Sequence, residues 1–309
     1  MKNSWIFVFA LSLMIPVLAG CGSKPAVPGL PAPGSPAEPE REVIKRVEAV
    51  MVVVDNYSKA RPQSGLQEAS IVYEFLVEGG VTRFLAVYDR LLAQDVIVGP
   101  IRSLRPHIAA QAKEHGKIVA HSGYSARTEK LISSLGIKEI TGSTHLFRDS
   151  ARRAPHNLYT TLERLASTRD TAVMQTETVT EIRLPDGYEA ASSFEISYNS
   201  QNVISYRFDA EKGAYLRFIN GIAHQDRQTG EQYSAYRVIV RRARYVNVPG
   251  TELVEIDLQG AGQGWLYQAG RKYEIRWENS DGKTRYFYQD GTELDLRFNN
   301  TWIQIVSSQ

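Results

Sequence analysis

Short alternating runs of hydrophobic and polar residues dominate the first half of the chain and predict β-strands. Residues 82–88 alternate and are rich in β-forming side chains, so we predict a strand there. Residues 71–77 predict a second strand, and Glu78-Gly79-Gly80 between the two indicates a tight hairpin turn. The nearly unbroken apolar run at residues 48–54 is typical of a strand that is buried on both faces.

Helices are predicted between later strands of the same half. One helix is expected after Pro106, which suits the first turn, and another over residues 128–135, closed by Gly136. Residues 158–167 predict a third helix. Alternating strands and helices favour an α+β or α/β domain with arginine-rich loops over residues 43–175.

The pattern changes after about residue 175. From residue 193 onward, short alternating runs are separated by turn signals such as Asn220-Gly221 and Asp281-Gly282, which suit hairpins. We therefore predict an all-β domain, a barrel or a sandwich, over residues 193–309, joined to the first domain by a linker over residues 176–192. Its many Tyr and Trp residues are typical of a β core, although an aromatic face could also stack on glycan rings.

The N-terminus has the pattern of a lipoprotein signal peptide over residues 1–20. A basic Lys2 precedes an apolar run at residues 5–17, which is too short to span a membrane as a mature helix. Leu18-Ala19-Gly20-Cys21 then resembles a lipobox, and Cys21 is the only cysteine of the sequence. We expect lipidation at Cys21, which would anchor the mature chain at the outer face of the bacterial cell membrane.

Composition narrows the possible functions further. The proline-rich residues 21–42 predict an extended tether between the lipid and the folded part. A formal net charge of +2 over 309 residues gives no support for nucleic acid as a partner. The sequence contains no P-loop, dinucleotide-binding fingerprint or nucleophile elbow, and no histidine pair has metal-ligand spacing. We therefore predict neither a cofactor nor a metal.

Arginines in two loop-rich segments of the first half form a candidate anion-binding set. Arg102 and Arg105 precede a predicted helix, whose N-terminal N–H groups favour anions. Guanidinium groups bind phosphate and carboxylate groups bidentately. The alternative is that each arginine pairs with a nearby acid. The candidate set is Arg83, Arg102, Arg105, Arg152 and Arg153.

Further polar candidates lie at predicted strand ends and in the same loops. Glu74 lies within a strand, and a buried carboxylate needs a partner, for which Arg83 on the next strand is the expected choice. His121 and His156 could act as general bases or converge on one site. Asp55 could hold a divalent metal beside a phosphate, although no other feature supports a metal. The polar candidates are Asp55, Asn56, Glu74, Glu78, Ser103, His121, His156 and Asn157.

Several of these residues lie in motifs that resemble those of the YerB-like bacterial lipoproteins. In the first half the motifs are Asp55-Asn56, Tyr73-Glu74, residues 60–66, 78–84 and 99–106, and Ala154-Pro155-His156-Asn157. In the second half they are Tyr215-Leu216-Arg217, His224-Gln225-Asp226 and Thr301-Trp302-Ile303. The resemblance covers nearly the whole mature chain. It implies a two-part extracytoplasmic lipoprotein and brings no assigned activity.

Three functions stay open at this point. The first is a cell-envelope binding or assembly lipoprotein, with an anionic ligand held by the first domain and a partner held by the second. The second is an enzyme acting on a phosphorylated or pyrophosphoryl-lipid envelope substrate, for which there is a weaker similarity to the LytR-like phosphotransferases. The third is a protein-interaction module without a small ligand. The first two require the loops at residues 55–65, 99–106 and 145–157 to converge.

Overall fold

The computed structural model describes residues 41–91, 95–170, 174–180, 184–251 and 253–308. The expected signal peptide, Cys21 and the tether up to residue 40 lie outside these ranges. Strands make up 49% of the structure, and three α-helices are present among the described residues. The fold is therefore mostly β. In the described part, no helix is long and apolar enough to cross a membrane.

The first half of the chain forms strands β1 to β9 and contains the three α-helices of the described residues. The strands are β1 (Arg41–Asp55), β2 (Ile71–Leu76), β3 (Thr82–Arg90), β4 (Ile97–Val98), β5 (Ile118–Ala120), β6 (Lys138–Ile140), β7 (Phe147–Arg148), β8 (Leu158–Thr161) and β9 (Gln175–Thr180). The helices are α1 (Pro106–Lys113), α2 (Ala126–Leu135) and α3 (Leu162–Ala166). Short 3₁₀ helices cover Ser58–Ala60, Leu66–Glu68 and Glu78–Gly80.

The second half contains only strands among its described residues. They are β10 (Glu189–Ala190), β11 (Ser193–Asn199), β12 (Asn202–Asp209), β13 (Ala214–Ile219), β14 (Ile222–Ala223), β15 (Ser234–Ala235), β16 (Arg237–Asn247), β17 (Val254–Asp257), β18 (Gly260–Gln268), β19 (Arg271–Asn279), β20 (Thr284–Tyr288) and β21 (Thr301–Ser307).

Most of the predicted elements of the first half are confirmed, and one is wrong. The hairpin of β2 and β3 forms around Glu78–Gly80, and α1 begins at Pro106 as expected. The helix expected over residues 158–167 is instead strand β8 followed by the short α3. Tyr159 and two threonines favour a strand, and β8 pairs with both β4 and β7.

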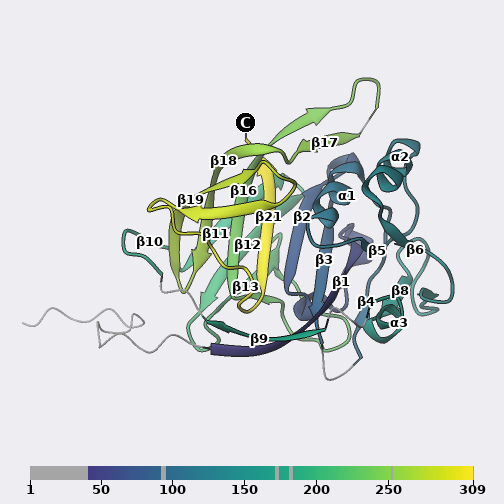
Figure 1. Ribbon diagram of the computed structural model, residues 1–309, viewed down its shortest axis with the longest axis horizontal. Helices are drawn as coiled ribbons and strands as arrows, with labels where there is room; N and C mark the ends of the chain where they lie inside the picture. Colours follow the sequence, from purple (N-terminus) through teal and green to yellow (C-terminus); the bar gives the residue numbers. More distant parts are fainter. Residues whose placement is uncertain (1–40, 92–94, 171–173, 181–183, 252, 309) are drawn as a thin grey trace, which may run out of the picture. The chain divides into compact units, whose positions relative to one another are not determined.

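A thirteen-stranded sheet organises the described part of the chain (Figure 1). Its order is β10-β19-β18-β16-β21-β2-β3-β1-β5-β6, with β17, β20 and β9 attached to β16, β19 and β1. The last strand, β21, lies between β2 and β16 and runs parallel to both. The sheet therefore continues without a break from the first half into the second.

Because one sheet contains strands of both halves, the sheet does not mark where the first expected domain ends. The expected domain boundaries therefore stay predictions. Residues 38–309 form one compact unit, and β9, at the start of the expected linker, pairs with β1. A five-stranded sheet, β11-β12-β13-β14 with β15 beside β13, is made entirely from the second half.

Each face of the long sheet is buried against a different layer. Val50, Val52 and Val54 of β1 belong to the core that includes residues of α3 and of the five-stranded sheet. Met51 and Val53 belong to the opposite core, which includes residues of α1 and α2. Because residues 49–54 of β1 are buried on both faces, this part of the strand is apolar without alternation. β1 ends at Asp55, where the polar candidates begin.

Candidate functional site

The three loops that follow the strand ends converge. Ser64 and Gly99 exchange backbone hydrogen bonds of 2.9 and 3.2 Å, and the Asp55 N–H donates to the Pro100 carbonyl at 2.8 Å. The Ile101 N–H donates to the Leu158 carbonyl at 2.6 Å. The loops around residues 55–65, 99–106 and 145–157 are thus held at one place, as an anion site in the first half requires.

Gly99 permits this close approach. A Cβ atom added there would lie 2.6 Å from Cδ1 of Tyr159 and 2.9 Å from the carbonyl oxygen of Leu158, and its φ is +153°. Since one of these contacts is backbone, a side chain cannot be accommodated by a rotamer change alone. The chain therefore needs glycine at this position for steric reasons.

Gly99→Ala is expected to lower the free energy of unfolding by about 1–3 kcal/mol, because the added methyl overpacks the loop junction. Urea unfolding followed by far-UV circular dichroism measures the change. Gly142→Ala is the control, because nothing lies within 4 Å of a Cβ at Gly142. Equal free energies of unfolding for Gly99→Ala and Gly142→Ala would contradict this prediction, because the loop junction would then accommodate the added methyl group without cost.

Asp55 and His156 form a hydrogen-bonded pair where the loops meet. Asp55 is 2% exposed, and its Oδ2 lies 2.7 Å from Nδ1 of His156. Because an ionised carboxylate only accepts hydrogen bonds, Nδ1 carries the proton and Nε2 is the unprotonated nitrogen of the neutral ring. The Tyr57 N–H donates to Oδ1 of Asp55 at 3.0 Å, and the Tyr57 ring stacks on the imidazole. Arg102 Nε lies 3.1 Å from Oδ2.

A basic pocket of about 380 Å³ opens beside this pair. No carboxylate is among the described residues that line it, which are Lys59, Ala151, Arg152, Arg153, Ala154, Pro155 and His156. Lys59 and Arg153 are exposed, and within the described residues neither makes an ion pair. We call this hollow the basic pocket. Its positive charge comes in part from Lys59 and Arg153, which have no ion-pair partner among the described residues.

Arg152 has a different role in the basic pocket. Its guanidinium donates to the carbonyls of Lys59, Arg61 and Pro62 at 2.9–3.1 Å and to the Tyr159 hydroxyl at 2.8 Å. These bonds connect the loop of residues 151–156 to the loop of residues 57–62. Arg152 therefore fixes the shape of the pocket as well as contributing charge.

Arg83 and Arg105 do not line the basic pocket. Both bind Glu78: Arg105 Nε lies 2.8 Å from Oε2, and an Arg83 terminal nitrogen lies 3.1 Å from Oε1. Burial alone would raise the pKa of Glu78, but the hydrogen bond from Arg105 and the charge of Arg83 lower this pKa to about 2. The two guanidinium groups are thus paired with a local acid, the alternative considered for each arginine.

The expected pair of Glu74 with Arg83 is wrong, and the strand register explains why. Glu74 lies opposite Phe84 and Phe75 lies opposite Arg83 in the β2–β3 ladder. Directly opposite residues share a face of the sheet, so Arg83 lies on the face away from Glu74. The partner of Glu74 is Arg217 of β13, at 2.8 Å.

The Glu74–Arg217 pair is the centre of a buried polar network. Both side chains are fully buried. Glu74 also accepts hydrogen bonds from Thr82 at 2.7 Å and Asn56 at 3.1 Å, and Arg217 donates to the Tyr206 hydroxyl at 2.6 Å. Every charged atom of the pair thus has a compensating partner, which buried ion pairs require.

His224 extends this network to the end of β1. Arg217 Nε donates to His224 Nδ1 at 3.0 Å, and His224 Nε2 lies 2.6 Å from Gln63 Oε1. Gln63 in turn donates to the Asp55 carbonyl at 2.9 Å. Burial, followed by the charges of Arg217 and Arg61, lowers the pKa of His224 well below its usual value, so the ring is neutral and Nε2 carries its proton.

The sequence reasoning missed Arg217, His224 and Gln63 as polar core residues. All three lie in motifs that resemble those of the YerB-like proteins, and this is the signal in the sequence that could have indicated them. Lys59 was missed as well, because a single surface lysine in a loop has no distinguishing pattern.

His121 is not brought together with His156 by any shared partner. It is fully buried, and its Nε2 lies 3.1 Å from Glu139 Oε2. Burial lowers the pKa of His121 to about 4, so it stays neutral near pH 7. Because its side chain has no exposed surface, a dissolved substrate does not reach it.

Ser103, Asn56 and Asn157 hold the loops in place. The Ser103 hydroxyl donates to the Ser122 carbonyl at 2.8 Å. The Asn157 side chain accepts from Arg148 at 2.8 Å and donates to the Arg152 carbonyl at 3.3 Å. Asn56 is 1% exposed and belongs to the Glu74 network.

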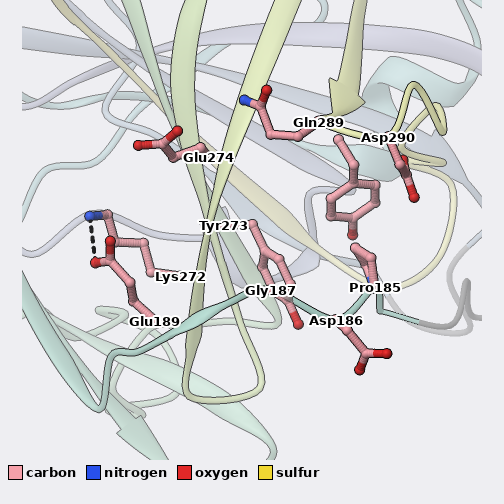
Figure 2. A pocket seen from close by; sticks show the side chains of 10 residues that line it. Pro185, Asp186, Gly187, Glu189, Lys272, Tyr273, Glu274, Gln289 and Asp290 are labelled. Carbon is pink, nitrogen blue, oxygen red and sulfur yellow. Dashed lines mark hydrogen bonds and ion pairs between the residues drawn. The ribbon is translucent and has the colours of Figure 1, made fainter.

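A hollow of similar volume in the second half has the opposite charge (Figure 2). It measures about 380 Å³, and among its described lining residues the one cationic side chain, Lys272, is paired with Glu189 at 2.9 Å. Asp186, Glu274 and Asp290 also line it. Anions are therefore repelled here and attracted to the basic pocket.

Another hollow, of about 650 Å³, is lined by several charges that pair with one another. Arg46 binds Asp89 and Glu177, and Arg297 binds Asp295 and Glu177. Across the described residues, no group of three or more His, Cys, Asp and Glu side chains is arranged to hold a metal ion.

Comparisons with known proteins match most of the folded chain. Residues 34–176 match the N-terminal domain, and residues 194–303 the C-terminal domain, of the family described as protein of unknown function DUF3048. YerB of Bacillus subtilis (strain 168), whose name marks it as a candidate lipoprotein, is 30% identical over 320 residues, which cover 98% of this chain and 96% of YerB. The chain belongs to the YerB-like family.

A crystal structure of YerB from Bacillus subtilis supports the same conclusion for the fold. It superposes with a TM-score of 0.73 at 29% identity and covers 84% of this chain and 91% of that chain. The resemblance inferred from the motifs is confirmed. Kinship with YerB also favours a lipoprotein, whose expected lipidation site Cys21 lies outside the described residues.

Proposed function

We propose that the protein is an extracytoplasmic lipoprotein, anchored through Cys21 at the outer face of the cell membrane, that binds an anionic ligand of the cell envelope in the basic pocket. The observation that carries the proposal is the pair of exposed cations, Lys59 and Arg153, in a pocket without a lining carboxylate. The lipobox pattern and the kinship with YerB support the anchor.

Electrostatics and shape both suit a phosphate-bearing ligand. Three cationic side chains line the basic pocket, and a fourth, Arg102, lies beside it on Asp55, whose carboxylate it shares with His156. The members of this cationic set are Lys59, Arg102, Arg152 and Arg153. Arg153 offers a planar fork and Lys59 a point charge, which together fit the tetrahedral oxygens of a phosphate.

The second half supplies support for the pocket and, in this proposal, a surface for a protein partner. Its residues Arg217 and His224 reach the end of β1 through Gln63. The finer division of the fold belongs to the proposal too: an α/β domain over residues 43–175 and a sandwich-like β domain over residues 193–309. The five-stranded sheet that shares a core with the long sheet supports the sandwich.

Substituting the free cations is expected to weaken anion binding. Pyrophosphate at about 100 times its Kd should stabilise the protein by about 2.7 kcal/mol and raise its melting temperature by a few degrees. Lys59→Gln and Arg153→Gln should each reduce this rise, and added salt should reduce it further by screening.

Lys212→Gln is the matched control, since Lys212 is exposed in the turn between β12 and β13, away from the lining of the pocket. The rise should be unchanged in this variant. Absence of any rise in the unsubstituted protein, or an equal loss in all three variants, would refute the basic pocket as the binding site.

A further inference from the structure

The geometry points to chemistry as well as binding: we propose that His156 is a general base and that the basic pocket hydrolyses a phosphate ester. This inference rests on the proposed function, because the ester must first bind among the same cations. It adds a reaction and a catalytic residue that anion binding alone does not need.

The orientation of the imidazole carries the proposal. Asp55 Oδ2 lies 2.7 Å from His156 Nδ1, which fixes the proton on that nitrogen and leaves a lone pair on Nε2. None of the described residues forms a hydrogen bond with Nε2, and His156 lines the basic pocket. A base that is held by a carboxylate, with its other nitrogen free of hydrogen bonds to described residues and its side chain beside a binding pocket, is the arrangement that general-base catalysis uses.

The support behind Asp55 is more extensive than an ordinary surface ion pair requires. Its backbone N–H is bound by the Pro100 carbonyl at 2.8 Å, and its carbonyl accepts from Gln63 at 2.9 Å. The Tyr57 ring lies almost parallel to the imidazole, with centroids 5.4 Å apart and an angle of 12°. Such support from neighbouring residues fixes the base in one orientation before substrate binds.

The proposed reaction is the hydrolysis of a phosphate ester by water. His156 Nε2 accepts a proton from water while the water oxygen bonds to phosphorus and the bond from phosphorus to the ester oxygen breaks. The leaving alkoxide takes a proton from solvent, and the imidazolium returns its proton to solvent. Lys59 and Arg153 lie where they can stabilise the negative charge that develops on the non-bridging oxygens.

His121 provides a comparison within the same protein. It also lies beside a carboxylate, Glu139, at 3.1 Å, but its side chain is fully buried. Of the histidines in the described part of the chain that pair with a carboxylate, His156 is the one that also lines a pocket with unpaired cations. The comparison separates the proposed base from a histidine that serves packing alone.

The test uses the full-length protein purified in detergent, with bis(p-nitrophenyl) phosphate as a diester and p-nitrophenyl phosphate as a monoester. We expect turnover of at least one ester. His156→Gln should lower kcat by about 10²- to 10⁴-fold, the range expected for losing a general base. Its affinity for pyrophosphate should change less, by about two- to threefold, a change that corresponds to less than 1 kcal/mol.

Two further variants sharpen the result. Asp55→Asn should also lower kcat, because an amide donor favours the wrong tautomer of His156. His145→Gln is the matched control: His145 is partly exposed, and its Nδ1 faces the Arg164 carbonyl at 3.1 Å rather than a carboxylate. This control should retain full activity.

The pH profile provides a readout that a structural role would not change. The pH dependence of kcat should differ between the unsubstituted protein and His156→Gln, because a general base contributes to this profile and a glutamine side chain does not. The charged groups that face the imidazole and its partner are Asp55, Lys59, Arg102, Arg152 and Arg153.

The outcomes distinguish the two proposals. No turnover of either ester, with pyrophosphate still bound, overturns the catalytic inference and leaves the binding function intact. Turnover that persists in His156→Gln also overturns it. If pyrophosphate does not bind and neither ester is cleaved, both proposals fail.

Discussion

A chain that ends at Asn300 is expected not to fold in either half. Its missing residues include β21, which lies between β2 of the first half and β16 of the second. Trp302, Ile303 and Ile305 are fully buried in the cores on the two faces of the sheet. Truncating a single buried side chain of this size costs about 2–5 kcal/mol, and whole proteins are stable by only about 5–15 kcal/mol.

Far-UV circular dichroism and limited proteolysis measure the outcome. The control is a chain that ends at Ser307, which keeps all of β21 and should remain folded. If the chain ending at Asn300 still contained a protease-resistant fragment from residue 41 to about residue 180, the first half would be an independent domain. The expectation that both halves need β21 in order to fold would then be refuted.

Arg217→Met is expected to lower the free energy of unfolding by about 3–5 kcal/mol, because it leaves the buried charge of Glu74 without its partner. The substitution also removes hydrogen bonds to Tyr206 and His224 and a cation–π contact with Trp302 at 4.7 Å. Urea unfolding monitored by tryptophan fluorescence measures the loss. The double variant Glu74→Gln with Arg217→Met should lose less than the sum of the two single losses.

The matched control is an exposed pair of the same chemistry. Arg244 and Asp257 lie 3.0 Å apart with side chains 71% and 40% exposed, so Arg244→Met should change stability by less than about 1 kcal/mol. Equal losses in Arg217→Met and Arg244→Met would contradict the assignment of Glu74–Arg217 as the centre of the buried network.

The local pattern of hydrophobic and polar residues is sufficient to predict many strands and helices of the first half. The apolar run that became β1, the hairpin of β2 and β3 and the start of α1 at Pro106 are all visible in short windows of sequence. Residues 158–167 were misassigned because tertiary pairing of β8 with two other strands decided their conformation. Local propensity cannot contain that information.

The site was partly predictable for the same reason. Asp55, His156, Arg152 and Arg153 were candidates by residue type and position, yet Asp55 and His156 are 101 residues apart in sequence. Glu74 and Arg217 are separated by 143 residues. A single sequence shows which residues can form such pairs, whereas the strand register and the topology determine which pairs form.

The position of β21 also sets the order in which the protein can be completed. A chain that is made from its N-terminus presents β2 long before β21, so β2 has one open edge until β21 has been made. Unpaired strand edges of this kind invite aggregation of incomplete chains. The polar network that supports Asp55 contains residues of both halves, so it too is complete only after the second half has been made.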